Sequence, residues 1–475
     1  MSETAPHLTE PRLTQLHLGL GSFHRAHQAV YLQNLHDLGD CQWRIVGGNL
    51  RPDMLETIAA LQAQAGAYTL ETVTPAGERA YQWIEAIQQV IPWDAGLVGL
   101  TAVAADPATR IISFTVTEAG YYLDAHNRLD ESYADLRSDL AGETCCTLYG
   151  ALAKLLAARM QQQAGPVTLM NCDNLRSNGS RFLLGFQQFL EKRGEQALLA
   201  WVNAQTSAPN AMVDRITPRP TPDVRERVLA ATGRDDPAAV MGEAFIQWVV
   251  EDHFIAGRPA WERVGVEMVQ DVMPYEEAKI RLLNATHSCI AWAGTLRGYR
   301  YIHEGTHDPE IRQMAFDYVT EDVIPCLDTP EHPCPLDLPR YRDVVLDRFG
   351  NPNIQDTNQR VAMDGYSKIP GFIQPTLREA LAGGRGIAAV AMLPALFLAF
   401  LQRQQRGDIP YRYEDQAMDA GSAQRIVSAD DPVAAFAAER LLFGPLAGDG
   451  RLEAALRAAY ARVQHFMDKN QETTV

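Results

Sequence analysis

Residues 15–47 constrain the fold more than any other part of the chain. A short apolar run at 15–19 ends in glycine, apolar residues then recur at helical spacing from Ala29 to Leu38, and a second apolar run occupies 43–47. This order of strand, glycine turn, helix and strand is the opening unit of a parallel, doubly wound sheet. The chain is therefore expected to begin with an α/β domain.

The pattern changes near residue 275. Before it, helical stretches alternate with predicted strands at 111–116 and 167–172. Beyond it, helix-length apolar patterns predominate, at 276–296, 309–323 and 385–405. We therefore expect an α/β domain with a mostly parallel sheet over 1–275 and a mainly α-helical domain over 276–475. A length of 475 residues agrees, because single hydrophobic cores stop growing at about 250–300 residues.

Composition excludes several classes of protein. The formal net charge of −17 argues against sequence-independent binding of nucleic acid, which needs a Lys/Arg surface. The seven cysteines contain no CxxC pair and are expected to be reduced thiols. No secretory signal is visible at the N-terminus, so a cytoplasmic location is expected. The most apolar run, 387–401, is too short for a membrane span and is predicted to be a buried helix.

Gly19, Leu20, Gly21, Phe23 and His24 follow the first predicted strand and open a helix. This is the context of a Rossmann-type dinucleotide motif, in which glycines admit the backbone to a pyrophosphate and the helix N-terminus supplies N–H donors. His24 stands where the third glycine is usual. An ordinary tight turn remains the alternative interpretation.

The segment after the second strand bears on the choice of cofactor. Asp53 is the candidate for the carboxylate that holds the adenosine ribose, although it lies later than the usual spacing of about 20 residues. Arg51 beside it could instead accept a 2′-phosphate. NAD is favoured and NADP stays open; Asp53 could also simply cap the next helix.

The second group of candidates is Lys279, Asn284 and His287 on a predicted helix. At about 100° per residue, His287 and Asn284 lie about 80° and 140° from Lys279, on one side of a straight α-helix. A lysine whose pKa is lowered by burial can act as a general base, and an amide can donate to a developing alkoxide. The alternative is a solvated lysine beside a core histidine.

Other candidates are less specific on spacing alone. Asn174 follows the strand 167–172, where open α/β sheets bind ligands, and is either a turn former or a catalytic amide. Arg360 and Lys368 are surface charges unless a substrate uses them. The His24 to His27 pair lacks the HExxH arrangement and a third ligand at short spacing, so no catalytic metal is expected.

These residues resemble the polyol-specific long-chain dehydrogenases, the mannitol dehydrogenase family. The family signature of Lys, Asn five residues on and His three further matches Lys279, Asn284 and His287 without a gap. Its N-terminal cofactor motif matches GLGSFHRAHQ, including the histidine at position 24. Further similar stretches are 171–174, 212–218 and 242–254. The stretches 274–295, 318–327, 351–360 and 391–396 are most similar to members that act on D-arabinitol.

The resemblance implies a Rossmann-type domain, a mainly helical domain and a metal-free active site in the cleft between them. It implies that Lys279 is the general base, that Asn174 and Asn284 stabilise the alkoxide, and that His287 orients the substrate. Asp214 matches a carboxylate that helps proton movement.

By the same resemblance, Arg360 and Lys368 contact the polyol chain. The expected partners are NAD and a small polyol or ketose, with no nucleic acid or membrane, in a monomer or small homo-oligomer. The resemblance implies reversible, NAD-dependent oxidation of D-arabinitol to D-xylulose. The alternatives are oxidation of D-mannitol, reduction of a hexuronate such as D-fructuronate, and a non-catalytic nicotinamide sensor.

Overall fold

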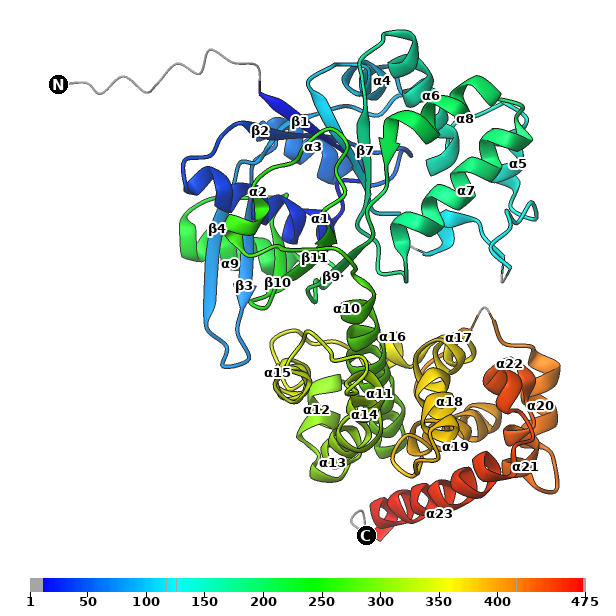
Figure 1. Cartoon of the computed structure of the whole chain (residues 1–475). Coiled ribbons are helices and arrows are strands. Elements are labelled where there is room, and N and C mark those ends of the chain that lie inside the picture. The colour runs from blue at the N-terminus through cyan, green and yellow to red at the C-terminus, as the bar shows by residue number, and fades with distance from the viewer. Residues whose placement is uncertain (1–11, 117, 125, 416, 473–475) are drawn as a thin grey trace. The chain divides into compact units, whose positions relative to one another are not determined.

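The computed structural model describes residues 12–116, 118–124, 126–415 and 417–472. The chain divides into two compact units. One comprises Met1–Thr74 and Glu78–Met273, and the other comprises Pro75–Gly77 and Pro274–Val475. The first unit contains the strands, whereas the second consists mainly of helices (Figure 1).

A six-stranded parallel sheet forms the centre of the first unit, in the order β5-β2-β1-β6-β7-β8. Its strands are β1 (Leu13–Leu18), β2 (Trp43–Gly48), β5 (Ile87–Val90), β6 (Thr109–Phe114), β7 (Val167–Asn171) and β8 (Thr206–Ser207). The four strands expected from sequence correspond to β1, β2, β6 and β7 and agree with them within two residues at each end. The prediction of a parallel α/β sheet is confirmed.

Both faces of this sheet are covered. Ile112 and Val46 belong to one apolar cluster, whereas Ile111 and Ile45 belong to another. Adjacent residues of a strand point to opposite faces, so two clusters require two layers of cover. The first cluster includes residues of α4 (Val98–Ala104), α6 (Leu148–Gln161), α7 (Asn178–Lys192) and α8 (Gln196–Gln205), and the second includes residues of α1 (Ser22–Ala26), α2 (Gln28–Asp37) and α3 (Leu55–Ala63).

Two small sheets were not predicted. Their orders are β10-β3-β4 and β12-β11-β9. They contain β3 (Tyr68–Val73), β4 (Arg79–Ile84), β9 (Ala211–Asp214), β10 (Val240–Glu243), β11 (Gln247–Glu251) and β12 (Glu267–Val269). Strands of three to six residues with mixed polarity give little periodic signal, which explains why the sequence did not reveal them.

The second unit interrupts two of its expected helices with π-helical turns. Residues 276–296 contain the end of α10 (Met273–Ala278), the π-helix η3 (Lys279–Asn284) and most of α11 (Ala285–Arg297). Residues 309–323 contain α13 (Pro309–Asp317) and the π-helix η4 (Tyr318–Val323). Apolar spacing indicates a helix but does not distinguish its hydrogen-bond pattern, so this difference was not accessible from sequence.

The helix α19 (Met392–Arg406), which contains most of the apolar run 387–401, begins seven residues later than the predicted helical segment 385–405. Glycines at 383, 384 and 386 precede it, and Gly384 has a φ of +67°. Residues 392–401 are all buried, which confirms a core helix. No helix among the described residues has the length and apolarity to span a bilayer.

Candidate active site

The turn after β1 has the backbone shape of a nucleotide-binding turn. Gly19 has a φ of +104°, and a Cβ there would approach the Thr115 carbonyl oxygen to 3.2 Å. At Gly21, by contrast, a Cβ would meet nothing within 4 Å. The turn is tied to β2 by the Gly19 N–H, which donates to the Gly48 carbonyl at 2.9 Å. Gly19 is therefore required by conformation, and the space beside Gly21 can admit a ligand.

This turn lies at the switch point of the sheet. The chain passes from β1 to β2 on one side, while β6 pairs with β1 on the other side. Open α/β sheets bind nucleotides outside the carboxyl ends of strands at such a point. Thr115, directly after β6, has a buried hydroxyl with no hydrogen-bond partner among the described residues. The open space and the hydroxyl both suit a bound dinucleotide.

His24 supports the turn from within the core. Its ring is fully buried and stacks on His17 with ring centroids 3.4 Å apart. Since a carbonyl only accepts, His17 Nε2 donates to Gly19 O at 3.0 Å, and its Nδ1 accepts from Ser113 Oγ at 2.8 Å. Burial lowers the pKa of His17 to about 3 and that of His24 well below its usual value. Both histidines are therefore neutral. A neutral support beneath the turn is compatible with a pyrophosphate bound to its backbone N–H groups.

Phe23 precedes His24 in the chain and is half-buried, and its ring stacks on His27 with centroids 5.0 Å apart. Leu20 donates its N–H to Asn49 Oδ1 at 3.0 Å, which joins the turn to the loop after β2. Sequence reasoning did not single out Asn49, although its place directly after β2 was a usable signal.

Asp53 is exposed on that same loop. Asn49 Nδ2 lies 3.4 Å from its carboxylate. The N-cap of α3 is Met54 and no side chain caps the helix, so the interpretation of Asp53 as a helix cap is wrong. Asp53 remains a candidate for the ribose.

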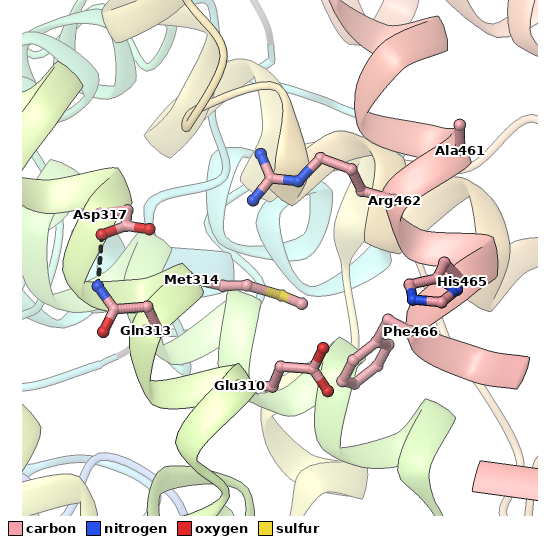
Figure 2. Close-up of a pocket in the computed structure, with 8 residues that line it drawn as sticks. All are labelled: Glu310, Gln313, Met314, Asp317, Ala461, Arg462, His465 and Phe466. Atoms are coloured by element: carbon pink, nitrogen blue, oxygen red, sulfur yellow. Dashed lines mark hydrogen bonds between the residues drawn. The ribbon is translucent and has the colours of Figure 1, made fainter. Parts of the chain in front are cut away.

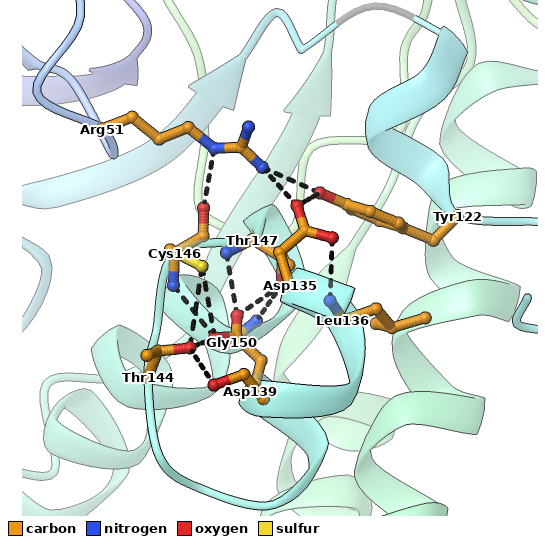
Figure 3. A network of polar contacts seen from close by, with 10 residues as sticks. Arg51, Tyr122, Asp135, Leu136, Asp139, Thr144, Cys146, Thr147 and Gly150 are labelled. Atoms are coloured by element: carbon orange, nitrogen blue, oxygen red, sulfur yellow. Dashed lines mark hydrogen bonds and ion pairs between the residues drawn. The ribbon is translucent and has the colours of Figure 1, made fainter. Parts of the chain in front are cut away.

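Arg51 is held by three acceptors of the first unit (Figure 3). One terminal nitrogen donates to both Tyr122 Oη and Asp135 Oδ2 at 2.8 Å, and Nε donates to the Cys146 carbonyl at 3.2 Å. Tyr122 in turn donates to Asp135 at 2.6 Å. The arginine that could bind a 2′-phosphate is thus already paired.

A buried polar network holds the end of β7. Asn171 Nδ2 donates to Tyr121 Oη, and Asn171 Oδ1 accepts from the Asp173 N–H at 2.7 Å. Asp173 accepts from the Val116 N–H at 2.9 Å, which fixes the ends of β6 and β7 together. Asn178, which the sequence did not indicate, bonds to both N–H and C=O of Ala211. The exposed Asn174 is thereby carried on a rigid support.

Asp214 is the last residue of β9 and is 5% exposed. It pairs in register with Gln247 of β11. Its neighbour Arg215 donates to the carbonyls of Glu243 and Ala26 at 2.8 and 2.7 Å, which ties this strand end to the last residue of α1. Asp214 therefore ends β9, and Asn174 lies three residues beyond the end of β7, both in the first unit.

Lys279 and Asn284 are the first and last residues of η3 in the second unit. The Ala285 N–H bonds to the Ile280 carbonyl, the i to i+5 pattern of a π-helix. Residues five apart are one hydrogen-bonded turn apart there, which draws Asn284 closer to Lys279 than the 140° expected for a straight α-helix. Lys279 is 5% exposed, so the interpretation as a solvated lysine is wrong.

Arg281 and Tyr318 fix this π-turn. Arg281 Nε donates to Thr376 Oγ1 at 3.0 Å, and a terminal nitrogen donates to Glu379 Oε2 at 2.7 Å. The buried Tyr318 hydroxyl donates to the Arg281 carbonyl at 2.6 Å. The neighbouring helices therefore hold both the side chain and the backbone of the turn.

His287 lies on α11 next to the turn. Its ring stacks on Phe349 with centroids 4.3 Å apart, and Nε2 lies 3.3 Å from Asp356 Oδ2. Burial lowers the pKa of His287, and the opposing effect of Asp356 does not reverse it, so the imidazole is neutral at pH 7. Burial alone would raise the pKa of Asp356, but hydrogen bonding with His287 and Arg360 holds it well below its usual range.

Arg360 and Lys368 belong to helices that pack around the same site. Arg360, on α16 (Asn358–Ala362), makes a bidentate ion pair with Asp356, with N–O distances of 2.6 and 2.5 Å. Lys368 ends α17 (Gly365–Lys368) and donates to the Val361 carbonyl at 2.6 Å. α16 packs against α11, and η5 (Ile369–Ile373), which follows Lys368, packs against η3. The second unit thus assembles five predicted residues on adjoining elements.

Two further observations concern metal ligands and cavities. The described residues contain no cluster of three or more His, Cys, Asp or Glu side chains suited to a metal ion. A groove of about 400 Å³ lies between α13 and α23 (Gly450–Glu472), and Figure 2 shows its two walls. The lining residues are Glu310, Gln313, Met314, Asp317, Ala461, Arg462, His465 and Phe466. None of them is a predicted catalytic residue.

Comparison with known proteins agrees with this arrangement. The family model of the mannitol dehydrogenase Rossmann domain matches residues 14–263, and that of the mannitol dehydrogenase C-terminal domain matches 271–464. A D-arabinitol 4-dehydrogenase of Ralstonia nicotianae is 63% identical, over 94% of this chain and 96% of that protein. One of Klebsiella pneumoniae is 55% identical, over 95% and 98%.

Among solved structures, a ternary complex of Pseudomonas fluorescens mannitol 2-dehydrogenase with NAD and D-mannitol is similar, with 33% identity and a TM-score of 0.82. The match covers 99% of this chain and 96% of that one. The family models cover most of the chain, so the resemblance deduced from sequence is confirmed: the chain is an oxidoreductase that belongs to the mannitol dehydrogenase family.

Proposed function

We propose that the protein oxidises the secondary alcohol of D-arabinitol to D-xylulose, reversibly, with NAD and without a metal ion. The observation that carries this proposal is Lys279, buried on a π-turn with Asn284 one hydrogen-bonded turn away. The choice of polyol rests on the relatives that are 63% and 55% identical.

Lys279 in its neutral form would take the hydroxyl proton as the carbon–oxygen double bond forms. Bound NAD supplies the acceptor for the hydride that leaves the same carbon. Asn174 and Asn284 would donate amide N–H groups to the oxygen while it carries negative charge, a role in which each donor contributes a factor of about 10²–10³. The base and the donors together remove the need for a Lewis acid.

The other candidates would position the reactants. Neutral His287 can hydrogen-bond a substrate hydroxyl without adding charge, and Arg360 and Lys368 would hold the far end of the polyol. Asp214 would assist proton movement near the base. In the first unit, Gly19, Leu20, Gly21 and Phe23 would line the dinucleotide, Asp53 would hold its ribose, and His24 would support the turn from the core. In this proposal, the dinucleotide-binding domain ends and the helical domain begins near residue 275.

The direct test is absorbance of reduced nicotinamide, with NAD or NADP and a panel of D-arabinitol, D-mannitol, D-sorbitol and xylitol, and D-fructuronate in the reverse direction. We expect NADH to form fastest with D-arabinitol. Lys279→Ala should lower kcat by a factor of about 10³ or more, because it removes the general base. Lys154→Ala, at an exposed lysine on α6, is the matched control.

Each alternative has its own outcome. Turnover of D-mannitol or D-fructuronate alone would overturn the choice of substrate. Binding of NAD without turnover of any polyol would favour a nicotinamide sensor.

A further inference from the structure

The loop after β2 carries Arg51 at the place where a 2′-phosphate would be recognised. Asn49, two residues earlier, accepts from the Leu20 N–H of the glycine turn, so this loop adjoins the turn. A guanidinium binds phosphate in bidentate fashion and is the residue type expected for NADP. By residue type alone, Arg51 should favour NADP.

The surroundings of Arg51 oppose that preference. Asp135 Oδ2 and Tyr122 Oη both accept from one of its terminal nitrogens at 2.8 Å, and the Cys146 carbonyl accepts from Nε at 3.2 Å (Figure 3). These contacts occupy Nε and one terminal nitrogen, so Arg51 would have to leave its three acceptors to grip a phosphate with that edge of the guanidinium. The Asp135 carboxylate would also repel the incoming dianion.

Contacts that do not involve Arg51 hold all three acceptors in position. The Tyr122 ring packs edge-on against Tyr133 with centroids 5.3 Å apart, and Asp135 lies in the first turn of α5 (Ala134–Leu140), where its Oδ1 accepts from the Leu136 N–H. The segment that carries Cys146 is held by buried Asp139, which accepts from the Cys146 and Thr147 N–H groups at 3.1 and 2.8 Å.

We infer that Asp135, assisted by Tyr122, is a specificity-determining residue that sequesters Arg51 and thereby selects NAD over NADP. This rests on the proposed function only in that the first unit binds a nicotinamide dinucleotide. The residue that discriminates NAD from NADP therefore lies on α5. It is distant in sequence from the loop after β2, whose residues usually determine the choice of cofactor.

The test is calorimetric titration of the full-length protein with 5′-AMP and 2′,5′-ADP, which differ only in the 2′-phosphate. Asp135→Asn should raise the affinity for 2′,5′-ADP about tenfold, because Arg51 loses its ion pair with Asp135 and can pair with the 2′-phosphate instead. The affinity for 5′-AMP, which has no 2′-phosphate, should change by no more than about twofold. Tyr122→Phe should give a smaller gain. The ratio of kcat/KM for NADP to that for NAD should rise in parallel.

Two controls isolate the mechanism. Adding Arg51→Gln to Asp135→Asn should abolish the gain. Asp235→Asn removes the same charge from a comparable exposed ion pair, with Arg225, and should alter neither affinity by more than about twofold.

An equal gain for both nucleotides, or a gain that survives loss of Arg51, would overturn the inference. Because the nucleotides bind without a polyol, the expected titrations combined with no polyol turnover would refute the proposed function and leave the inference standing. If the wild-type protein bound neither nucleotide, both would fail.

Discussion

The two units hold their candidate residues in opposite ways. In the first, the turn at Gly19 is shaped by backbone and supported by two buried, neutral histidines, His17 and His24. In the second, the π-turn is held by an ion pair of Arg281 with Glu379. Beside it, Asp356 pairs with Arg360 and lies 3.3 Å from His287.

This contrast matches the different demands of cofactor binding and proton transfer. A ligand that binds to backbone N–H groups needs a turn of fixed shape and no competing charge beneath it. A reaction that moves a proton needs ionisable groups held in defined positions. If this is so, the glycine turn of the first unit acts through its shape and the π-turn of the second unit through its ionisable and amide groups.

After loss of the base itself, the largest effect on kcat is expected at Asn284. Asn284→Ala should lower kcat about 10²–10³-fold with little change in KM for the polyol, because a donor to developing charge acts mainly in the transition state. Steady-state kinetics measures both. Asn203→Ala, at an exposed asparagine on α8, should leave kcat unchanged. A rise in KM with unchanged kcat would mean that Asn284 binds the ground state instead.

Gly19→Ala should weaken NAD binding at least about tenfold. The substitution adds a Cβ at a φ of +104° and 3.2 Å from Thr115 O, which costs about 1–3 kcal/mol or shifts the turn. Calorimetric titration with NAD measures the loss. Gly233→Ala, at another positive-φ glycine with open space around it, is the matched control and should lower stability alone. Unaltered NAD affinity in Gly19→Ala would contradict a role for turn shape.

The first unit should lose stability in mild acid. His17 has a pKa of about 3 when folded, because of burial, against about 6.5 when unfolded. Below pH 6.5 the unfolded chain binds a proton that the folded chain does not, so stability falls as pH falls toward 3. Each such histidine costs up to about 1.4 kcal/mol per pH unit.

Hydrogen exchange of β1 peptides at pH 7.0 and 5.5, corrected for intrinsic rates, measures this loss. His17→Gln should reduce the difference between the two pH values by about 1 kcal/mol. An undiminished pH dependence in the variant would show that other groups are responsible.

The smallest expected effect is on kcat, when a buried tyrosine of each unit is replaced by phenylalanine. Tyr318 and Tyr149 are both buried and both donate to a backbone carbonyl, of Arg281 at 2.6 Å and of Tyr121 at 2.8 Å. Tyr→Phe at either position should cost about 1 kcal/mol of stability. Only Tyr318→Phe should also lower kcat, about threefold, because it loosens the turn that carries Lys279. Thermal unfolding and kcat measured side by side decide this, and an equal kcat loss in Tyr149→Phe would contradict it.

Much of the fold could be predicted because apolar periodicity is local. The strands β1, β2, β6 and β7 and the helical second half follow from residue spacing alone. The short strands of the two small sheets could not be predicted, since runs of three to six residues with mixed polarity give little periodic signal. In addition, β10 and β9 each pair with a strand that is distant in sequence. Likewise, Asn178 reaches Ala211 across 33 positions.

The candidate residues were predicted unequally. Gly19 and Gly21 follow a predicted strand, so a glycine turn at this position could be predicted from the sequence. The motif of Lys279, Asn284 and His287 was identified by resemblance, whereas spacing alone favoured a solvated lysine. The partners of these residues, Phe349 and Asp356, reach His287 only through the fold.

The sequence by itself determined the parallel sheet, the glycine turn and the helical second half, because each depends on residues adjacent along the chain. Tertiary structure decided that Lys279 is buried on a π-turn, that His17 and His24 are neutral, and that Arg51 is paired with Asp135. Charge state, helix type and partner choice depend on neighbours that are distant in sequence, and only packing brings those neighbours within a few ångströms.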